Sequence, residues 1–181
     1  MDKFEEKEID SKQIFEGRLL KLRVDTVKLP NGAIGNREIV LHPGAVAVVA
    51  LTDKDELVLV RQFRRPTGEV LLEIPAGIPR AGESGEEAAR RELKEETGYV
   101  ALEVKKVWEG YTSPGYSNEL IRFYFAKVSH RGMQQPDEDE FVEAELVPAK
   151  KALDLVRTGK IRDNKTMVGV MIADLARRGE L

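Results

Sequence analysis

GIPRAGESGEEAARRELKEETGY, residues 77–99, is the most informative stretch of the chain. Helix-forming residues dominate its second half, and apolar side chains recur there at helical spacing, at Ala88, Ala89 and Leu93. Ser84 is a suitable N-cap, because its hydroxyl can accept a backbone N–H, and Gly98 is a suitable C-cap. The stretch therefore predicts one helix over residues 84–97.

Three glutamates lie close together on this predicted helix. Glu92 and Glu96 are one turn apart and face the same way, and Glu95 lies beside them. Like charges at this spacing repel, and a hard divalent cation such as Mg²⁺ would offset them. Arg91 lies four residues before Glu95 and can orient that carboxylate. The alternative is a solvated helix face held by Arg–Glu pairs.

The spacing of these residues resembles the Nudix box, Gly-x5-Glu-x7-Arg-Glu-U-x-Glu-Glu-x-Gly-U, in which U is aliphatic. Only the last position departs, where Tyr99 stands. Because that position packs into the core, the departure leaves the acidic positions untouched. The resemblance implies an α+β protein with the Nudix fold, an α/β/α sandwich of mixed sheets that contains the box helix, preceded by an N-terminal β-hairpin region.

Strand patterns lie on both sides of the box. Residues 18–29 alternate apolar with polar side chains, Pro30-Asn31-Gly32 is a turn signal, and residues 38–41 can return as the second arm of a hairpin. Further strands are predicted at residues 45–51, 57–63, 70–74, 102–108, 120–128 and 141–147, and closing helices at residues 149–158 and 165–178.

Three further features resemble one branch of the family, the ADP-ribose pyrophosphatases. Pro114 lies fifteen residues beyond the box. Gln62-Phe63-Arg64 precedes the run Glu73-Ile74-Pro75-Ala76-Gly77, and residues 137–143 form an acidic loop before a strand. The resemblance implies metal-dependent hydrolysis of ADP-ribose to AMP and ribose 5-phosphate.

The resemblance also assigns roles to residues. It implies that Glu92 and Glu96 are the main metal ligands, with the backbone carbonyl of Ala76 and with Glu95 as an accessory ligand. The ion would be Mg²⁺, with Mn²⁺ as a substitute. Glu140 is the implied general base, with Glu138 and Asp139 as alternatives in the same loop, and Arg91 and Glu95 complete the catalytic set.

Substrate contacts are implied at two places. Arg37 and Arg64 resemble arginines that hold ADP-ribose, and Glu73 lies in the run that accompanies Arg64. Ser113, Gly115 and Glu119 lie in the loop that shapes the side of the terminal ribose. Each has a plainer interpretation: Arg64 as an ion-pair partner, Arg37 as a solvated strand residue, and Pro114-Gly115 as an ordinary turn.

Composition narrows the classes of function. The chain has 181 residues, no cysteine and a net charge of −3, with 32 acidic against 29 basic residues. This balance offers nucleic acid no general attraction, and the missing cysteine excludes disulfides and thiolate sites. The first ten residues lack the apolar core of a signal peptide, and the apolar run at residues 45–51 is too short to span a membrane. We expect a cytoplasmic enzyme that acts on a small molecule and has neither nucleic-acid nor membrane partners.

The expected organisation has an N-terminal strand region, residues 1–42, and a Nudix hydrolase domain, residues 43–181. Relatives in this branch are homodimers that exchange N-terminal strands, and the resemblance implies the same here. Arg37 would then serve the partner's substrate. Two alternatives stay open: a Nudix pyrophosphatase for another nucleoside diphosphate sugar or a dinucleotide, and a non-catalytic ADP-ribose sensor. The second is disfavoured because the box carboxylates are all present.

Overall fold

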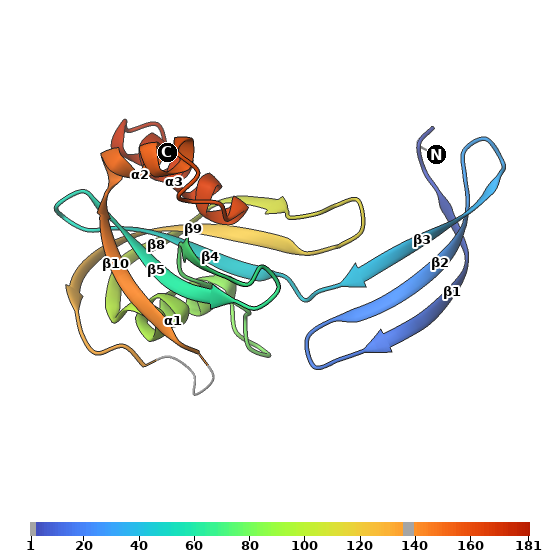
Figure 1. Cartoon of the computed structure of the whole chain (residues 1–181), viewed down its shortest axis with the longest axis horizontal. Helices are drawn as coiled ribbons and strands as arrows, with labels where there is room; N and C mark the ends of the chain where they lie inside the picture. Colours follow the sequence, from blue (N-terminus) through green and yellow to red (C-terminus); the bar gives the residue numbers. More distant parts are fainter. Residues whose placement is uncertain (1–2, 136–139) are drawn as a thin grey trace. The chain divides into compact units, whose positions relative to one another are not determined.

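The computed structural model describes residues 3–135 and 140–181, and it divides into two compact units. One unit comprises the chain up to Gly44 together with Tyr111–Leu120, and the other comprises Ala45–Gly110 and Ile121–Leu181. Figure 1 labels their elements. No helix in the described ranges is both long and apolar enough to cross a membrane.

The larger unit is built on a mixed sheet, within which seven strands are described. Its order is β10-β5-β4-β9-β8, with β6 paired to β5 and β7 to β4. The strands are β4 (Ala45–Leu51), β5 (Glu56–Arg64), β6 (Glu69–Glu73), β7 (Ala76–Gly77), β8 (Tyr99–Tyr111), β9 (Leu120–Arg131) and β10 (Val142–Pro148). Strands β4 and β9 run parallel, whereas β5 pairs with β4, β6 and β10 in antiparallel fashion.

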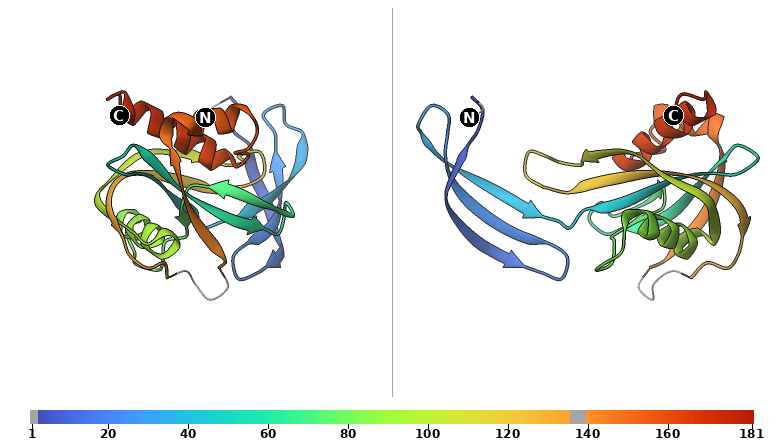
Figure 2. Two further views of the ribbon diagram at one scale, coloured as in Figure 1. Left: turned by 60° about the vertical axis from the view of Figure 1, so that its left-hand side comes forward. Right: turned by 180° about the vertical axis from the view of Figure 1, so that it is seen from behind.

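Strand β4 shows why the sheet is covered on both faces. All seven of its residues are buried. Because side chains alternate along a strand, Val46 and Val48 join the core beneath helix α1 (Gly85–Thr97), whereas Ala47 and Val49 join the core beneath α3 (Asn164–Arg177). Helix α2 (Ala149–Arg157) packs beside α3. Figure 2 shows α1 on one face and α2 and α3 on the other. The predicted α/β/α sandwich is therefore confirmed.

The smaller unit contains a three-stranded antiparallel sheet in the order β1-β2-β3, comprising β1 (Lys7–Glu16), β2 (Lys21–Lys28) and β3 (Ile34–Leu41). The hairpin of β2 and β3 and its turn agree with the prediction, since Leu29 N donates to Ala33 O at 2.8 Å. Strand β1 was not predicted. It adds a third strand to what the sequence suggested was a hairpin.

The loop between β8 and β9 packs within the smaller unit. Val40 N donates to Tyr116 O at 2.8 Å, and His42 N donates to the side chain of Asn118 at 2.8 Å. A parallel bridge joins Val40 and Ser117. The loop that includes Ser113, Gly115 and Glu119 is therefore attached to the end of β3.

Candidate metal and catalytic site

Helix α1 is fixed at both ends by the residues that the sequence singled out. At its N-terminus, Glu87 N donates to Ser84 Oγ at 3.2 Å, and Ser84 N donates to the Glu87 carboxylate at 2.8 Å, which makes a capping box. At its C-terminus, Gly98 has φ 76° and donates its N–H to Lys94 O. A side chain is disfavoured there both by that φ and because a Cβ would lie 2.5 Å from Gly132 O.

The last two turns of α1 bury two carboxylates side by side. Glu92 is 7% exposed and Glu96 is 2% exposed. Burial raises the pKa of Glu92, and burial followed by the charge of Glu92 raises the pKa of Glu96. The ionised forms of two buried, adjacent carboxyl groups are unfavourable unless a cation compensates their charge. This arrangement fits a cation that the resemblance implies at these glutamates.

Arg91 organises the remaining carboxylates of the box. Its Nε and Nη2 donate to both oxygens of Glu83 at 2.8 and 2.9 Å, and its Nη1 donates to Glu92 at 2.7 Å and to Glu95 at 2.8 Å. A further bond reaches the carbonyl of Ile78 at 3.2 Å. The hydrogen bonds from Arg91 lower the pKa of Glu83 to about 2. Arg91 therefore contacts Glu95 directly, as its predicted orienting role requires.

The segment before the box approaches the buried carboxylates closely. Ala76 N donates to Glu96 Oε2 at 3.2 Å, and both Ala76 and Gly77 pair with β4. A Cβ on Gly77 would lie 2.0 Å from Glu92 Oε1. The glycine therefore leaves room for the Glu92 carboxylate. The backbone of Ala76 thus lies in the same small region as the two glutamates.

The donors are chemically suited to a hard cation, although within residues 3–135 and 140–181 no three acidic or histidine side chains are gathered to hold one. Glu92 and Glu95 are both bound to Arg91, and Glu95 also accepts from Arg80 at 3.2 Å. Carboxylate and carbonyl oxygens are the ligands that Mg²⁺ and Mn²⁺ prefer. The donor types fit such an ion, which would compete with Arg91 for Glu92.

The carboxylate of Glu140 interacts electrostatically with the buried glutamates of α1. It is half-buried, and its carboxylate raises the pKa of both Glu92 and Glu96. This effect requires that the carboxylate lie within electrostatic range of the α1 glutamates. The alternative bases, Glu138 and Asp139, lie outside the described residues.

Arg64 and Glu73 form an ion pair with each other. Arg64 Nε and Nη2 donate to the two Glu73 oxygens at 2.8 and 2.7 Å, and Glu73 is only 1% exposed. Burial alone would raise the pKa of Glu73, but hydrogen bonds from Arg64 and Lys165 hold it below its usual value. Arg64 keeps 39% of its side chain exposed, and its charge offsets only a small part of the rise that burial causes in the pKa of Glu96.

The other predicted substrate residues are in the smaller unit. Arg37 is bound to the carboxylate of Glu6, with its Nε 2.9 Å from Oε2. Ser113 O accepts from the backbone of Tyr116 and Ser117, which closes the turn that contains Gly115. Glu119 accepts from Thr112 Oγ1 at 2.8 Å, and its other oxygen lies 3.6 Å from His42 Nδ1.

A side-chain network that the sequence did not reveal adjoins Glu73. Lys165 binds Glu73 and Asp163, and Thr166 binds Asp163 and the backbone of Ile74. Lys165 is separated from Glu73 by 92 positions, so no local spacing could have found it.

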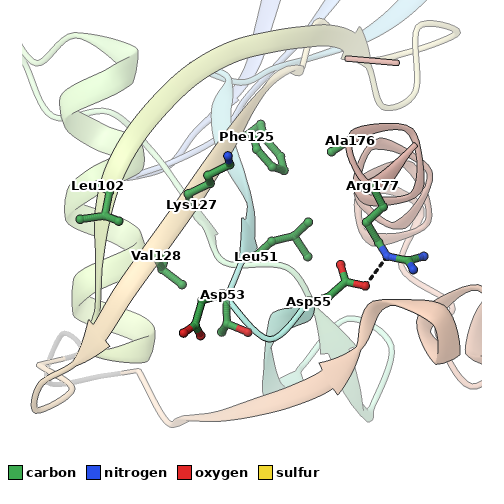
Figure 3. A pocket seen from close by; sticks show the side chains of 10 residues that line it. Leu51, Asp53, Asp55, Leu102, Phe125, Lys127, Val128, Ala176 and Arg177 are labelled. Atoms are coloured by element: carbon green, nitrogen blue, oxygen red, sulfur yellow. Dashed lines mark hydrogen bonds and ion pairs between the residues drawn. The ribbon is translucent and has the colours of Figure 1, made fainter. Parts of the chain in front are cut away.

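A surface pocket of about 440 Å³ lies elsewhere in the larger unit and includes none of the predicted site residues. Figure 3 shows its apolar and charged side chains and the ion pair between Asp55 and Arg177, whose distance is 2.6 Å. Six of its lining residues are Leu51, Asp55, Leu102, Phe125, Lys127 and Arg177.

Comparison with known proteins identifies the family. A family model described as the NUDIX domain matches residues 41–167. The chain belongs to the Nudix family. A second model, described as the nucleoside diphosphate sugar hydrolase N-terminal domain, matches residues 6–40, so both parts of this Nudix protein have counterparts.

Curated relatives align over almost the whole chain. An ADP-ribose pyrophosphatase from Bacillus subtilis (strain 168) is 44% identical over 177 residues, covering 97% of this chain and 96% of the relative. A methanol dehydrogenase activator from Bacillus methanolicus is 44% identical over 174 residues, covering 95% and 94%. A crystal structure of an ADP compounds hydrolase superposes with a TM-score of 0.85 at 23% identity, covering 97% of each chain, which confirms the fold.

The close approach of Gly77 to Glu92 leads to a prediction. Gly77→Ala should push the Glu92 carboxylate away and lower both the affinity for the divalent ion and the activity by roughly 10–100-fold, the range seen when residues that orient metal ligands are lost. Metal titrations of activity would measure this. Gly110→Ala is the matched control, because a Cβ there meets nothing within 4 Å. Equal metal dependence in both variants would contradict the argument.

Proposed function

We propose that this Nudix protein hydrolyses the pyrophosphate bond of ADP-ribose to give AMP and ribose 5-phosphate, with Mg²⁺ as the cofactor and Mn²⁺ as a substitute. The observation that carries this proposal is the 44% identity to an ADP-ribose pyrophosphatase along 97% of the chain. The buried glutamate pair on α1 supports the chemistry, because the paired charges favour a cation.

Glu92, Glu96 and the carbonyl of Ala76 would hold the ion, and Glu95 would be an accessory ligand. When bound, the ion neutralises the diphosphate and lowers the pKa of water. Glu140 would take the proton from the attacking water, a role that its position within electrostatic range of Glu92 and Glu96 supports. Arg91 would keep Glu95 oriented through its 2.8 Å contact.

Arg64 would bind the diphosphate of the substrate. Its guanidinium is anchored by Glu73 yet part of it stays exposed, and a planar guanidinium suits phosphate oxygens. Arg37 would bind the substrate after exchanging its contact with Glu6, and Ser113, Gly115 and Glu119 would shape the side of the terminal ribose. Glu73 would contribute by holding Arg64, since both its oxygens are already engaged.

We further propose the organisation of a homodimer, in which residues 1–42 form the dimerisation region and contact substrate and residues 43–181 form the hydrolase domain. Strand β1 supports this proposal, because all ten of its residues are exposed and it lies at the edge of its sheet, where it can pair with another strand. A solution mass of one chain would refute it. The cysteine-free composition supports a place in the cytoplasm.

A panel of substrates tests the proposed reaction. With Mg²⁺ or Mn²⁺ present, ADP-ribose should have the highest kcat/KM, ahead of ADP-glucose, GDP-mannose, NADH and diadenosine polyphosphates. GDP-mannose is included because a GDP-mannose pyrophosphatase from Escherichia coli (strain K12) is 39% identical over 134 residues, covering 69% of this chain and 70% of the relative. A better substrate elsewhere in the panel would replace ADP-ribose. Tight ADP-ribose binding without turnover would favour the sensor.

A further inference from the structure

Lys165, in the first turn of α3, lies between two carboxylates. Its Nζ donates to Glu73 Oε2 and, at 2.9 Å, to Oδ2 of Asp163, the N-cap of α3. The Lys165 side chain is only 12% exposed. A lysine is rarely so enclosed unless its charge is paired, so these two contacts hold the ammonium in place.

Glu73 connects Lys165 to Arg64. The carboxylate is 1% exposed, and its oxygens accept from Arg64 on one side and from Lys165 on the other. Arg64 thereby receives two parallel hydrogen bonds, at 2.8 and 2.7 Å, which fix the plane of its guanidinium. The chain of contacts thus runs from the start of α3 to the arginine proposed to meet the diphosphate.

The balance of charge also depends on Lys165. The cluster contains two cations, Arg64 and Lys165, and two carboxylates, Glu73 and Asp163, so it is neutral as a whole. Without Lys165 the cluster would carry one negative charge close to the place of a doubly anionic diphosphate. Glu73 would also have Arg64 as its main remaining cationic partner and would hold it more tightly.

Anchoring of α3 itself does not require the ammonium. Asp163 caps the helix through Thr166 N at 2.9 Å, and Thr166 Oγ1 accepts from Ile74 N at 2.9 Å. Gly169 lets α3 lie against Ile74, since a Cβ there would be 2.8 Å from Ile74 Cδ1. These contacts attach α3 to Ile74, just after β6, through atoms other than the Lys165 ammonium.

We propose that Lys165 is a positioning residue for substrate affinity, which fixes Glu73 so that Arg64 presents its guanidinium to the diphosphate of a nucleoside diphosphate sugar. The proposal rests on the proposed function. Arg64 binds a phosphate group that is charged both before and during the reaction. Loss of its orientation should therefore raise KM more than it lowers kcat.

Steady-state kinetics with ADP-ribose and Mg²⁺ test this. Lys165→Met should raise KM about tenfold and change kcat by less than about threefold, the pattern of lost uniform binding. Lys165→Arg, which keeps the charge, should restore most of the affinity. Lys151→Met, at an exposed position of α2, is the control and should leave KM unchanged. If Lys165→Met is too unstable, Lys165→Gln should give the same rise in KM.

A double-mutant cycle separates positioning from general destabilisation. In an Arg64→Gln background, Lys165→Met should raise KM little further, because the residue on which it acts is already gone. Additive effects of the two substitutions, or an unchanged KM in Lys165→Met, would overturn this inference alone. An unsubstituted protein that neither binds nor cleaves ADP-ribose would overturn the proposed function and this inference together.

Discussion

Glu96→Gln is expected to abolish hydrolysis while making the folded protein more stable in the absence of metal. Glu96 is 2% exposed, and burial followed by the charges of Glu92 and Glu140 raises its pKa. Glutamine has nearly the same shape, keeps an oxygen to accept from Ala76 N, and removes the buried charge. Since Glu96 is a proposed metal ligand, its replacement should lower kcat/KM by about 10³-fold or more.

Two measurements together identify this behaviour. In EDTA the melting temperature of Glu96→Gln should rise by roughly 3 °C, the response of a chain of this size to about 1 kcal/mol. Added Mg²⁺ should then raise it less than it raises that of the unsubstituted protein, because ligand binding stabilises only what it binds. Glu86→Gln, on the exposed side of the same helix, should change neither property appreciably. A lower melting temperature in EDTA would contradict the view that this carboxylate is destabilising.

The acidic face of α1 could be predicted because its determinants are local. The spacing of Glu92 and Glu96 by one turn places them together in any helix. The caps at Ser84 and Gly98 fix where that helix begins and ends. Strand β4 could equally be predicted from the sequence, since its continuous apolar run is what a strand buried on both faces requires.

Strand β1 could not be predicted because its sequence has neither a regular alternation of apolar and polar residues nor the continuous apolar run of a buried strand. All ten of its residues are exposed, and its strand conformation depends on pairing with β2, from Lys7 opposite Lys28 to Glu16 opposite Lys21. Attachment of residues 111–120 to β3 similarly depends on backbone bonds between positions distant in the chain. Such non-local pairings leave no periodic pattern in the sequence.

The predicted substrate residues lie between these extremes. Sequence reasoning left open whether Arg64 is a ligand-binding residue or an ion-pair partner, and the structure shows the ion pair with Glu73. The two roles are compatible, because the anchored guanidinium is still partly exposed. Lys165 could not be predicted because its contact with Glu73 depends on how α3 packs against β4 and β6.

Arg91→Ala is expected to destabilise the folded protein strongly. One guanidinium, 16% exposed, serves Glu83, Glu92 and Glu95. Its removal leaves Glu83, just before α1, and Glu92 and Glu95 on α1 with no shared counter-charge, and breaking such a partly buried network should cost about 3 kcal/mol. Arg91→Lys should recover little, because an ammonium cannot reproduce the planar fork that bonds both oxygens of Glu83.

Chemical denaturation at several pH values tests this network, with Arg90→Ala as the control. Arg90 pairs with the exposed Glu86 and donates to the carbonyl of Ala101 at 3.0 Å, so its loss should cost about 1–2 kcal/mol. Arg91 lowers the pKa of Glu83 from 4.5 to about 2. A lowered folded-state pKa adds stability above pH 4.5, and this stability is lost as the pH falls toward 2. The penalty of Arg91→Ala should therefore be largest above pH 4.5 and shrink below it. A penalty that is the same at pH 3 and pH 7 would show that Arg91 acts through packing rather than through its charge.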